Sequence, residues 1–552
     1  MNHPDDLRRL AQAMFPHCEA TPEQYEAMYP PRSLPEGARV TRIAPSPTGY
    51  LHLGVLFTAT INFLTAQQSG GVFYFRLEDT DKKREVQDGA ADIVDGLRRY
   101  GVTVSEGYFG AGDERGDYGP YQQSRRAHIY HAYVKSLVEQ DLAYPCFCSA
   151  EALSQVRTEQ EADKQRTGYY GKYAKCRDLT AQQAIDRIAA GDPYVVRLRS
   201  PGDESRRIKF DDMIKGTIEM PENDQDIVLL KTDGIPTYHF AHAVDDHLMR
   251  TTHVIRGDEW IASVPIHLQL FRVLGFKPPK YAHVSPIMKE ENGSKRKLSK
   301  RKDPEAAVHF YAEQGYPADS VMEYLLTIAN SDFEEWRRRN ADAPRSAFPF
   351  SLKKMSLSGA LFDLNKLNDV SKNRICLLDA AEVTAQILQW AEQNDEAFYA
   401  RLKADADFAQ RLFGIDRGGN KPRKDIACWS EAPAYAAYFY DESFDGRYDW
   451  PENLSKETVS AVIKAYDYDP SLDRQQWFDA LKALAPSLGF CPEVKEYKKN
   501  PDAYIGHVGD ISTVLRVAVT GRRNTPDLHS ILQLLGKEKV TARLQRALDK
   551  GV

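Results

Sequence analysis

Ala38-Arg-Val-Thr-Arg-Ile-Ala44, continued by Pro45-Ser-Pro-Thr-Gly-Tyr-Leu-His-Leu-Gly54, sets the architecture of the first third of the chain. The first seven residues are typical of a short strand, and the Pro- and Gly-containing segment is typical of a turn. A helix is expected from about residue 53 to 68, where Gly70-Gly71 stops it, and a second strand from 72 to 77. Strand, turn, helix and strand predict a βαβ unit, which implies a parallel sheet covered by helices.

The rest of the chain divides by composition. Residues 1–37 are polar and end in a Pro-rich turn, which predicts one or two appended helices. A segment from 141 to 215, rich in Gln, Lys, Arg and Asp, reads as an inserted α+β domain. Strand-like runs return at 226–231 and 252–256, and the sequence beyond 370 is mostly helical. The predicted class is therefore α/β with a helical C-terminal part.

Bulk composition excludes several classes of protein. The 552 residues are 42% hydrophobic and 28% charged, which is typical of a globular protein of several domains. Neither a membrane-spanning run nor the apolar segment of a signal peptide occurs. Seven cysteines are an odd, sparse set that indicates reduced thiols, so we expect a cytoplasmic protein. The net charge of −6 gives no support to nucleic-acid binding, which would have to rely on local basic patches.

Two segments carry candidate chemistry. The first, residues 45–54, falls between a strand and a helix, where backbone N–H groups and the helix dipole attract phosphate; Gly49 and Gly54 permit close approach, and His52 can donate a hydrogen bond. The second is residues 295–302, in which six of eight residues are basic, preceded by an apparently flexible Glu290-Glu-Asn-Gly-Ser294. Alone, the first reads equally well as a plain turn, and the second reads better as a solvated loop.

Together the two segments resemble the paired signatures of the class I aminoacyl-tRNA synthetases. They stand here as His52-Leu-Gly-Val55 and Lys297-Leu-Ser-Lys-Arg301. Val55 replaces a histidine of the general signature, as is common in the glutamyl-tRNA synthetases. Further segments resemble that family in order along the chain: 42–49, 75–81, 119–124, 230–249, 254–260 and 515–521.

This resemblance implies a fold and a division of the chain. The expected fold is a Rossmann-like parallel-sheet catalytic domain with an inserted α+β domain, followed by an α-helical anticodon-binding region. The expected boundaries are 1–37 for the N-terminal extension, 38–140 for the first catalytic half, 141–215 for the inserted acceptor-binding domain, 216–290 for the second catalytic half, 291–370 for the lysine-rich loop with a stem-contact region, and 371–552 for the anticodon-binding region.

The resemblance also implies an activity and its partners. A glutamate–tRNA ligase activates L-glutamate with ATP and Mg²⁺ to glutamyl-adenylate, then transfers it to the 3′-terminal adenosine of tRNA(Glu). The chemistry is positioning and charge neutralisation at phosphorus, with no enzyme nucleophile. One cation about 4 Å from a phosphate oxygen contributes roughly 4 kcal/mol at an effective dielectric near 20. We expect a monomer that contacts no membrane.

Site residues follow from the positions that match the family. The catalytic residues implied are His52, Lys297 and Lys300. Those implied for ATP are His52, Gly54, Glu259, Trp260, Lys297, Ser299, Lys300 and Arg301. Those implied for glutamate are Arg42, Ser46, Glu78, Tyr238, His242 and Arg256, where the arginines suit carboxylates and Glu78 suits the ammonium. His242 departs from the commoner Asn or Val of this family.

Two candidate metal sites were weighed. Asp245-Asp246-His247 is expected at a strand end, where adjacent side chains cannot all face one ion, so no metal is expected there. Some relatives hold zinc in the inserted domain, and Cys146, Cys148 and Cys176 are a weak candidate here. Only three sulfurs are present, whereas structural zinc takes four ligands, so Tyr173 or a His or Asp neighbour would have to complete the set. We therefore expect reduced thiols rather than zinc.

Alternatives remain beside the leading interpretation. Glutaminyl-tRNA synthetase is the nearest enzyme, although its anticodon domain is built of β-barrels rather than helices. A non-catalytic tRNA-binding adaptor is a second alternative, disfavoured because His52, Lys297 and Lys300 are intact. Nucleotide motifs of the P-loop and dinucleotide types are absent from the sequence. Candidate tRNA contacts are the basic runs 337–339, 421–424, 498–499 and 522–523.

Overall fold

The computed structural model describes residues 3–46, 51–80, 89–299, 301–419 and 421–551. The chain forms two compact units. The first contains Met1–Phe310 and Leu325–Asp363, and the second contains Tyr311–Tyr324 and Leu364–Val552. The six-part division expected from the sequence is finer than these two units and stays a prediction.

A βαβ unit opens the catalytic part of the first unit, as the sequence predicts. Strand β1 (Val40–Ile43) is followed by helix α3 (Leu53–Gln67) and strand β2 (Val72–Phe75). The two strands are parallel, with Val40 opposite Val72. Gly71 is required where the strands meet, because a Cβ at this position would lie 2.0 Å from the carbonyl oxygen of Arg39. The apolar face of α3 covers this pair.

The sheet extends outward from β2. Strand β3 (Glu106–Gly110) pairs with β2 in parallel, and β4 (Asp113–Arg115) pairs with β3 in antiparallel orientation at the edge. Helix α4 (Gly89–Arg99) connects to β3, and α5 (Ala127–Glu139) follows β4.

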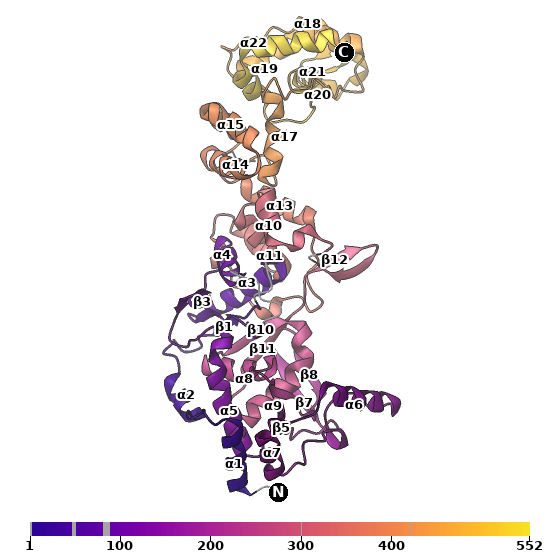
Figure 1. Ribbon diagram of the computed structural model, residues 1–552. Helices are drawn as coiled ribbons and strands as arrows, with labels where there is room; N and C mark the ends of the chain where they lie inside the picture. The colour runs from indigo at the N-terminus through magenta and orange to yellow at the C-terminus, as the bar shows by residue number, and fades with distance from the viewer. Residues whose placement is uncertain (1–2, 47–50, 81–88, 300, 420, 552) are drawn as a thin grey trace. The chain divides into compact units, whose positions relative to one another are not determined.

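The second half of the sheet begins beside β1. Strand β10 (His253–Gly257), helix α9 (Val264–Val273) and strand β11 (Lys280–Val284) form another βαβ unit with parallel strands. The backbone N–H of Thr252 donates to the carbonyl oxygen of Val40 at 3.0 Å, which places β10 next to β1 (Figure 1). The chain thus leaves β1 in one direction, toward β2, and leaves β10 in the other, toward β11. Such a point of reversal is where open α/β sheets bind ligands.

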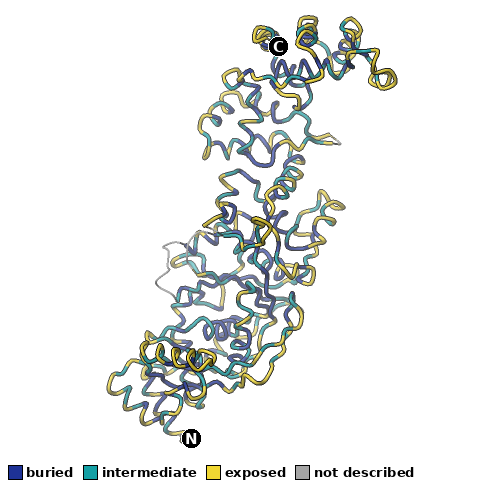
Figure 2. The backbone as a smooth tube through the Cα atoms, turned by 90° about the vertical axis from the view of Figure 1, so that its right-hand side faces the viewer, coloured by how far each residue is buried: buried dark blue, intermediate teal, exposed yellow. Residues whose placement is uncertain are grey.

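Five further strands of the first unit lie outside the two βαβ units. Strands β7 (Arg207–Asp212) and β8 (Gly216–Pro221) form an antiparallel pair beyond β11, and Tyr281 of β11 pairs with Asp212. Strands β5 (Ala143–Cys146), β6 (Val195–Leu198) and β9 (Val228–Leu230) form a separate antiparallel sheet. Helices α6 (Ala150–Ala162) and α7 (Ala181–Ala189) connect β5 to β6, and most of α6 is exposed (Figure 2).

The N-terminal extension is an integral part of the first unit. Its helices, α1 (Pro4–Met14) and α2 (Pro22–Met28), match the expected number and pack against α5. Glu26 of α2 accepts a hydrogen bond from Arg250 at 2.9 Å and lies 2.6 Å from His247 Nε2. The Tyr29 hydroxyl donates to the carbonyl oxygen of Gly119 at 2.7 Å. The extension therefore supports the region where helix α8 (Tyr238–Leu248) ends.

A hairpin and three helices follow β11. The hairpin strands are β12 (Met288–Glu291) and β13 (Ser294–Lys297), joined by Asn292-Gly293 with positive φ at both residues. Glu290–Ser294, expected to be flexible, is thus the end of a tight hairpin, which Asn-Gly favours. The helices are α10 (Val308–Gln314), α11 (Ala318–Ala329) and α12 (Phe333–Arg339).

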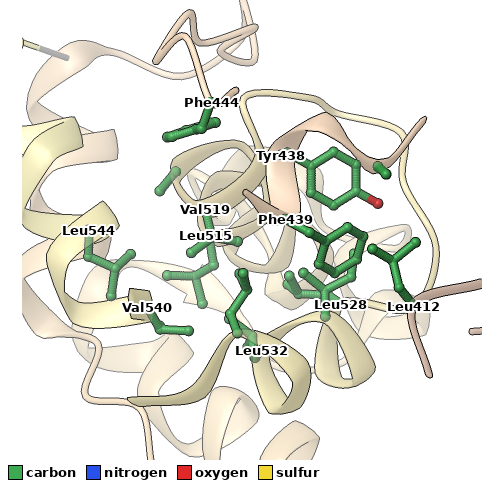
Figure 3. Close-up of a cluster of buried hydrophobic side chains, with 14 of the residues drawn as sticks. Leu412, Tyr438, Phe439, Phe444, Leu515, Val519, Leu528, Leu532, Val540 and Leu544 are labelled. Carbon is green, nitrogen blue, oxygen red and sulfur yellow. The ribbon is translucent and has the colours of Figure 1, made fainter. Parts of the chain in front are cut away.

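The second unit is helical around one core, with two very short strands, β14 (Phe490–Cys491) and β15 (Gly506–His507). Leu515 and Val519 point into an apolar cluster with Leu532 and Val540 (Figure 3). No helix of the described chain combines the length and apolarity needed to cross a bilayer. The helices are α13 (Leu364–Ile375), α14 (Ala380–Asn394), α15 (Glu396–Ala404), α16 (Ala406–Gly414), α17 (Ala432–Ala436), α18 (Lys456–Ala465), α19 (Arg474–Leu484), α20 (Val494–Tyr497), α21 (Val508–Thr520) and α22 (Leu528–Asp549).

Candidate active site

A cavity of about 430 Å³ lies at the carboxyl ends of β1, β10 and β11. It is the point of reversal in the sheet described above, and it gathers residues from position 42 to position 306. Ten of the residues expected from the sequence line it: Arg42, Ser46, His52, Gly54, Glu78, Tyr238, Arg256, Glu259, Trp260 and Lys297.

His52 stands at the start of helix α3. It occupies the N-cap position with extended backbone (φ −119°, ψ 161°), and Gly54 and Val55 of the first turn also line the cavity. The positive end of the helix dipole is therefore directed at this space, which favours an anion. The His52 ring lies against this turn, because a Cβ at position 54 would be in van der Waals contact with its Nδ1, at 3.4 Å.

Backbone contacts join the first signature segment to residues that follow the second one along the chain. His52 forms a β-bridge with Ala307, and the N–H of Val308 donates to the carbonyl oxygen of Leu51 at 3.2 Å. Lys297, at the end of the hairpin, lines the same cavity as His52. The structure thus brings together a histidine and a lysine that are far apart in the sequence.

Asp303 anchors the lysine-rich segment. Its carboxylate accepts hydrogen bonds from Arg296 at 2.6 and 2.8 Å, from Lys289 at 3.2 Å and from the N–H of Ser299 at 2.9 Å. Asp303 is only 2% exposed, and the hydrogen bonds, led by that from Arg296, hold the pKa of its carboxyl far below the usual range. Within the described residues Lys297 forms no ion pair, so its charge remains for a ligand.

Arg42 occupies one wall of the cavity, backed by carboxylates. Its Nε donates to both oxygens of Asp246 at 3.2 and 3.3 Å, and Arg76 donates to the same carboxylate at 2.7 Å. Asp246 is 1% exposed. Although burial opposes ionisation, the two arginines keep the pKa of Asp246 well below its usual value.

Glu78 provides the negative charge on this wall. One of its oxygens accepts from Arg76 Nη2 at 3.0 Å, and the carboxylate faces the cavity. Burial raises the pKa of Glu78 in spite of the neighbouring arginines. A bound ammonium group would oppose that effect and favour the charged carboxylate.

Arg256 occupies a second wall of the cavity, at the end of strand β10, and has different partners. Its guanidinium donates to Nε2 of His283 at 3.1 Å and to the Tyr238 hydroxyl at 3.3 Å, and lies 3.1 Å from Nδ1 of His267. Among the residues that the structure describes, no carboxylate forms an ion pair with Arg256, which is 5% exposed. The Trp260 ring closes this wall against Tyr238, at a centroid distance of 4.2 Å.

Three of the expected residues are not brought to the cavity wall, and a fourth is outside the described residues. His242 is fully buried behind Tyr238; its Nε2 lies 3.0 Å from the Tyr281 hydroxyl and its Nδ1 2.6 Å from Asp246. Burial lowers the pKa of His242 to about 4. Ser299 and Arg301 do not line the cavity, and Lys300 lies outside the described residues. His242 does not line the cavity, and the glutamate contact expected of it stays a prediction.

Several lining residues were not expected from the sequence. Val284 ends strand β11, Ser285 and Ile287 follow it, and Gly257 ends β10. The end of β11 could have been found, since the sequence places it immediately before the lysine-rich segment. The roles of His283 and Asp212 behind Arg256 carry no sequence signal.

The three cysteines of the inserted domain converge. Their sulfurs lie within 4.8 Å of one another, and Cys148 and Cys176 are 3.6 Å apart. The hydroxyl oxygen of Tyr169 lies 3.3 Å from the sulfurs of both Cys146 and Cys148. Tyr169, rather than Tyr173, thus supplies an oxygen beside the thiols.

Asp245, Asp246 and His247 lie in helix α8 rather than at a strand end, which corrects the sequence-based placement. Asp245 accepts hydrogen bonds from Arg126 at 2.7 Å, and Asp246 binds Arg42 and Arg76. His247 turns toward Glu26. The aspartates therefore serve a buried network of arginines, and the three side chains do not converge on one point.

The basic runs differ in how strongly they are engaged. Arg337 donates to three backbone carbonyls of residues 340–343, and Arg423 and Arg523 form ion pairs with Asp425 and Asp449. A second cavity, of about 620 Å³, lies beside the N-terminal extension, but none of the expected site residues lines it. The candidate chemistry therefore belongs to the smaller cavity.

Comparisons with known proteins agree with this geometry. Residues 39–369 match the family model of the catalytic domain of class I tRNA synthetases (E and Q), and residues 505–548 match an anticodon binding domain. The fold and the cavity at the sheet reversal thus define a class I aminoacyl-tRNA synthetase.

Comparison with individual relatives identifies the family within this class. The chain is 50% identical to the glutamate–tRNA ligase of Clostridium perfringens (strain SM101 / Type A), over 98% of this chain and 99% of that one, and 48% identical to that of Clostridium beijerinckii, over 98% and 100%. A crystal structure of a glutamate–tRNA ligase from Elizabethkingia meningosepticum in complex with its amino acid has a TM-score of 0.71 at 26% identity, covering 93% of this chain and 100% of that one. This chain belongs to the glutamate–tRNA ligases. Neither the glutaminyl nor the adaptor alternative gains support.

Proposed function

We propose that the cavity of about 430 Å³ binds L-glutamate and ATP and forms glutamyl-adenylate, which is then transferred to the 3′-terminal adenosine of tRNA(Glu). The observation that carries this assignment is the convergence of His52 and Lys297 with the two buried arginines, Arg42 and Arg256, in one cavity. Glutamate carries two carboxylates and one ammonium, and the cavity offers two guanidiniums and Glu78.

The proposed roles follow from charge and position. Arg42 and Arg256 bind the carboxylates of glutamate, and Glu78 binds its ammonium. His52 and Lys297, with Lys300 by resemblance, contact the phosphates of ATP and stabilise the charge that develops as the α-carboxylate of glutamate attacks the α-phosphate. Glu259 and Trp260 lie on the nucleotide side.

The second step requires only that the ester-forming hydroxyl of the tRNA reaches the activated carbonyl. No side chain has to act as a nucleophile, because the adenylate is already an activated acid. Mg²⁺ would arrive with the triphosphate and neutralise part of its charge. The helical second unit, with its match to an anticodon binding domain, is the part that we expect to select the tRNA.

The test is pyrophosphate exchange and aminoacylation with glutamate or glutamine, with and without purified tRNA. We expect activity with glutamate and none with glutamine. Lys297→Ala should slow adenylate formation by about two to three orders of magnitude, as for loss of one charge-stabilising donor, with the fold retained. Lys295→Ala is the matched control, since Lys295 lies on the same hairpin but does not line the cavity. Equal activity of both variants, or activity with glutamine, contradicts the assignment.

We also propose that the cysteine cluster holds a structural zinc ion. Sulfurs of a tetrahedral site with Zn–S near 2.3 Å are about 3.8 Å apart, close to the 3.6 Å between Cys148 and Cys176, and Tyr169 offers an oxygen at the fourth side. Such an ion would fasten the end of β5 to the segment that precedes α7. Metal analysis should find one zinc per chain, lost in Cys148→Ser and kept in Cys18→Ser. Zinc-free protein would restore the sequence-based expectation of reduced thiols.

Two further expectations stand from the sequence. A cytoplasmic location accords with the seven sparse cysteines, and a monomer is expected. Light scattering of the purified chain should give a mass near 62.5 kDa, and a mass near twice that value would exclude the monomer.

A further inference from the structure

Arg256 is held on both sides by neutral histidines. Its Nε donates to His283 Nε2 at 3.1 Å, and its Nη2 lies 3.1 Å from His267 Nδ1. A guanidinium has only donors, so the ring nitrogens that face it must be unprotonated acceptors. The partners of Arg256 therefore fix its orientation without cancelling its charge.

The tautomer of His283 is set from the other side. Because Nε2 accepts from Arg256, the ring proton resides on Nδ1, which lies 2.6 Å from Asp212 Oδ2. His283 is fully buried, and its flat ring stacks on Tyr281 with an interplanar angle of 10°. The imidazole thus has one orientation and one hydrogen pattern.

Asp212 is itself fixed by backbone groups. Its carboxylate accepts from the N–H of Ile214 at 3.0 Å, of Lys215 at 2.8 Å and of His283 at 3.1 Å. It sits at the end of β7, opposite Tyr281 of β11. The row Asp212, His283, Arg256 therefore runs from a rigid strand end to the cavity wall.

We propose that His283, held in one tautomer by Asp212, is a positioning residue for Arg256: it aims the guanidinium at a substrate carboxylate while leaving its charge available. A carboxylate in the place of the imidazole would orient Arg256 equally well but would compete with the substrate for its charge. The proposal rests on the proposed role of Arg256 in glutamate binding and adds the means by which that role is achieved.

The test compares His283→Phe, which keeps a ring but removes both hydrogen bonds, with His283→Gln, which can accept from Arg256 and donate to Asp212. We expect His283→Phe to raise KM for glutamate about ten- to a hundredfold, the effect of losing a hydrogen bond to a charged group, with KM for ATP within about twofold. His283→Gln should recover most of the loss. Asp212→Asn should raise KM for glutamate by a smaller factor.

His253→Phe is the matched control, because His253 is also buried in this sheet but contacts Thr252 rather than Arg256. It should leave both KM values unchanged. A folded His283→Phe enzyme with unchanged KM for glutamate overturns the proposal, as does a His283→Gln enzyme with an equal defect or an equal rise in KM for ATP. If His283→Phe fails to fold, Asp212→Asn and His283→Gln decide by the same criteria.

Arg256→Gln separates this proposal from the one on which it rests. If Arg256→Gln leaves KM for glutamate unchanged, the proposed role of Arg256 is wrong. If Arg256→Gln impairs glutamate binding while His283→Phe does not, the role of Arg256 stands and only the positioning by His283 is excluded.

Discussion

The two arginines of the cavity come from neighbouring strands, β1 and β10, and are stabilised in opposite ways. Arg42 shares the carboxylate of Asp246 with Arg76, so its charge is partly balanced inside the protein. Arg256 contacts two imidazoles and a phenol, and in the described chain it forms no ion pair. A buried cation can thus be retained either by a counter-charge or by neutral acceptors alone.

The difference has a physical consequence. Removing one partner of a buried ion pair leaves an unpaired charge, which costs several kcal/mol, whereas neutral hydrogen-bond acceptors contribute less to stability. The Arg42 wall should therefore be the one on which the fold depends. The Arg256 wall should be the one on which substrate binding depends more selectively.

The largest effect is expected on stability. Asp246→Asn removes the counter-charge from Arg42 and one of the carboxylate partners of Arg76, and it should lower the free energy of unfolding by about 3–5 kcal/mol in urea denaturation. The exposed Asp113, paired with Arg115, gives the control Asp113→Asn, for which we expect no measurable change in the free energy of unfolding. Similar small losses in both variants would remove the distinction between the walls.

The next effect is on activity. Arg256→Gln should reduce kcat/KM for glutamate by about two to three orders of magnitude, because a charge-assisted contact with a carboxylate is lost, while the unfolding free energy changes by less than about 1 kcal/mol. Arg42→Gln should reduce both quantities, since Asp246 loses a partner. Steady-state kinetics and urea denaturation of both variants give this comparison directly. If the two variants lose the same kcat/KM and the same free energy of unfolding, the proposed difference between the arginines is wrong.

The pH dependence of stability probes the Arg42 wall. His242, beside Asp246, has its pKa lowered to about 4, mainly by burial, so the unfolded chain takes up a proton near pH 6.5 that the folded chain refuses. The free energy of unfolding should therefore fall as the pH drops below 6.5, by about 1–2 kcal/mol at pH 5 from this residue. His242→Asn should remove this contribution, so the difference in free energy of unfolding between pH 7.5 and pH 5 should be smaller in the variant. The same difference in both proteins would contradict the role of His242.

The smallest effect is expected in the lysine-rich segment, where one carboxylate binds two cations and a third cation is left for the substrate. Asp303 binds Arg296 and Lys289 and leaves Lys297 unpaired among the described residues. Asp303→Asn should loosen the end of the hairpin and lower kcat/KM for ATP about tenfold, with KM for glutamate unchanged. Glu291→Gln, which removes the exposed partner of Arg296 on the same hairpin, is the control. A larger effect on glutamate than on ATP would be inconsistent with this role.

The residues that line the cavity could largely be predicted from the sequence, whereas the residues that hold them in place could not. The βαβ unit at 38–77 and the pairing of residues 52 and 297 follow from local patterns and from resemblance, because turns and charge runs are visible in one dimension. The burial of His242 behind Tyr238 was not visible in the sequence, because it depends on how helix α8 packs against strand β11. The contact of Asp212 with His283 spans 71 residues and depends on strand order, which no local pattern records.

The position of Tyr169 beside the cysteines is likewise a contact that local sequence patterns do not record. Its hydroxyl is 21 residues from Cys148 in the chain, and the objection to zinc rested on a missing fourth donor. Only the path of the segment between α6 and α7 brings that oxygen to the thiols. Short-range spacing identified the three cysteines as a weak zinc candidate and could not identify the oxygen of Tyr169 beside them.

The pairing of Arg42 with Asp246 also constrains how the chain emerges from the ribosome. The two residues are 204 positions apart, so at about 5–20 residues per second roughly 10–40 s pass between their synthesis. During that interval the Arg42 side chain has no counter-charge and cannot be enclosed without a large solvation penalty. The Arg42 side chain can therefore be enclosed between the strands only after α8 has been translated.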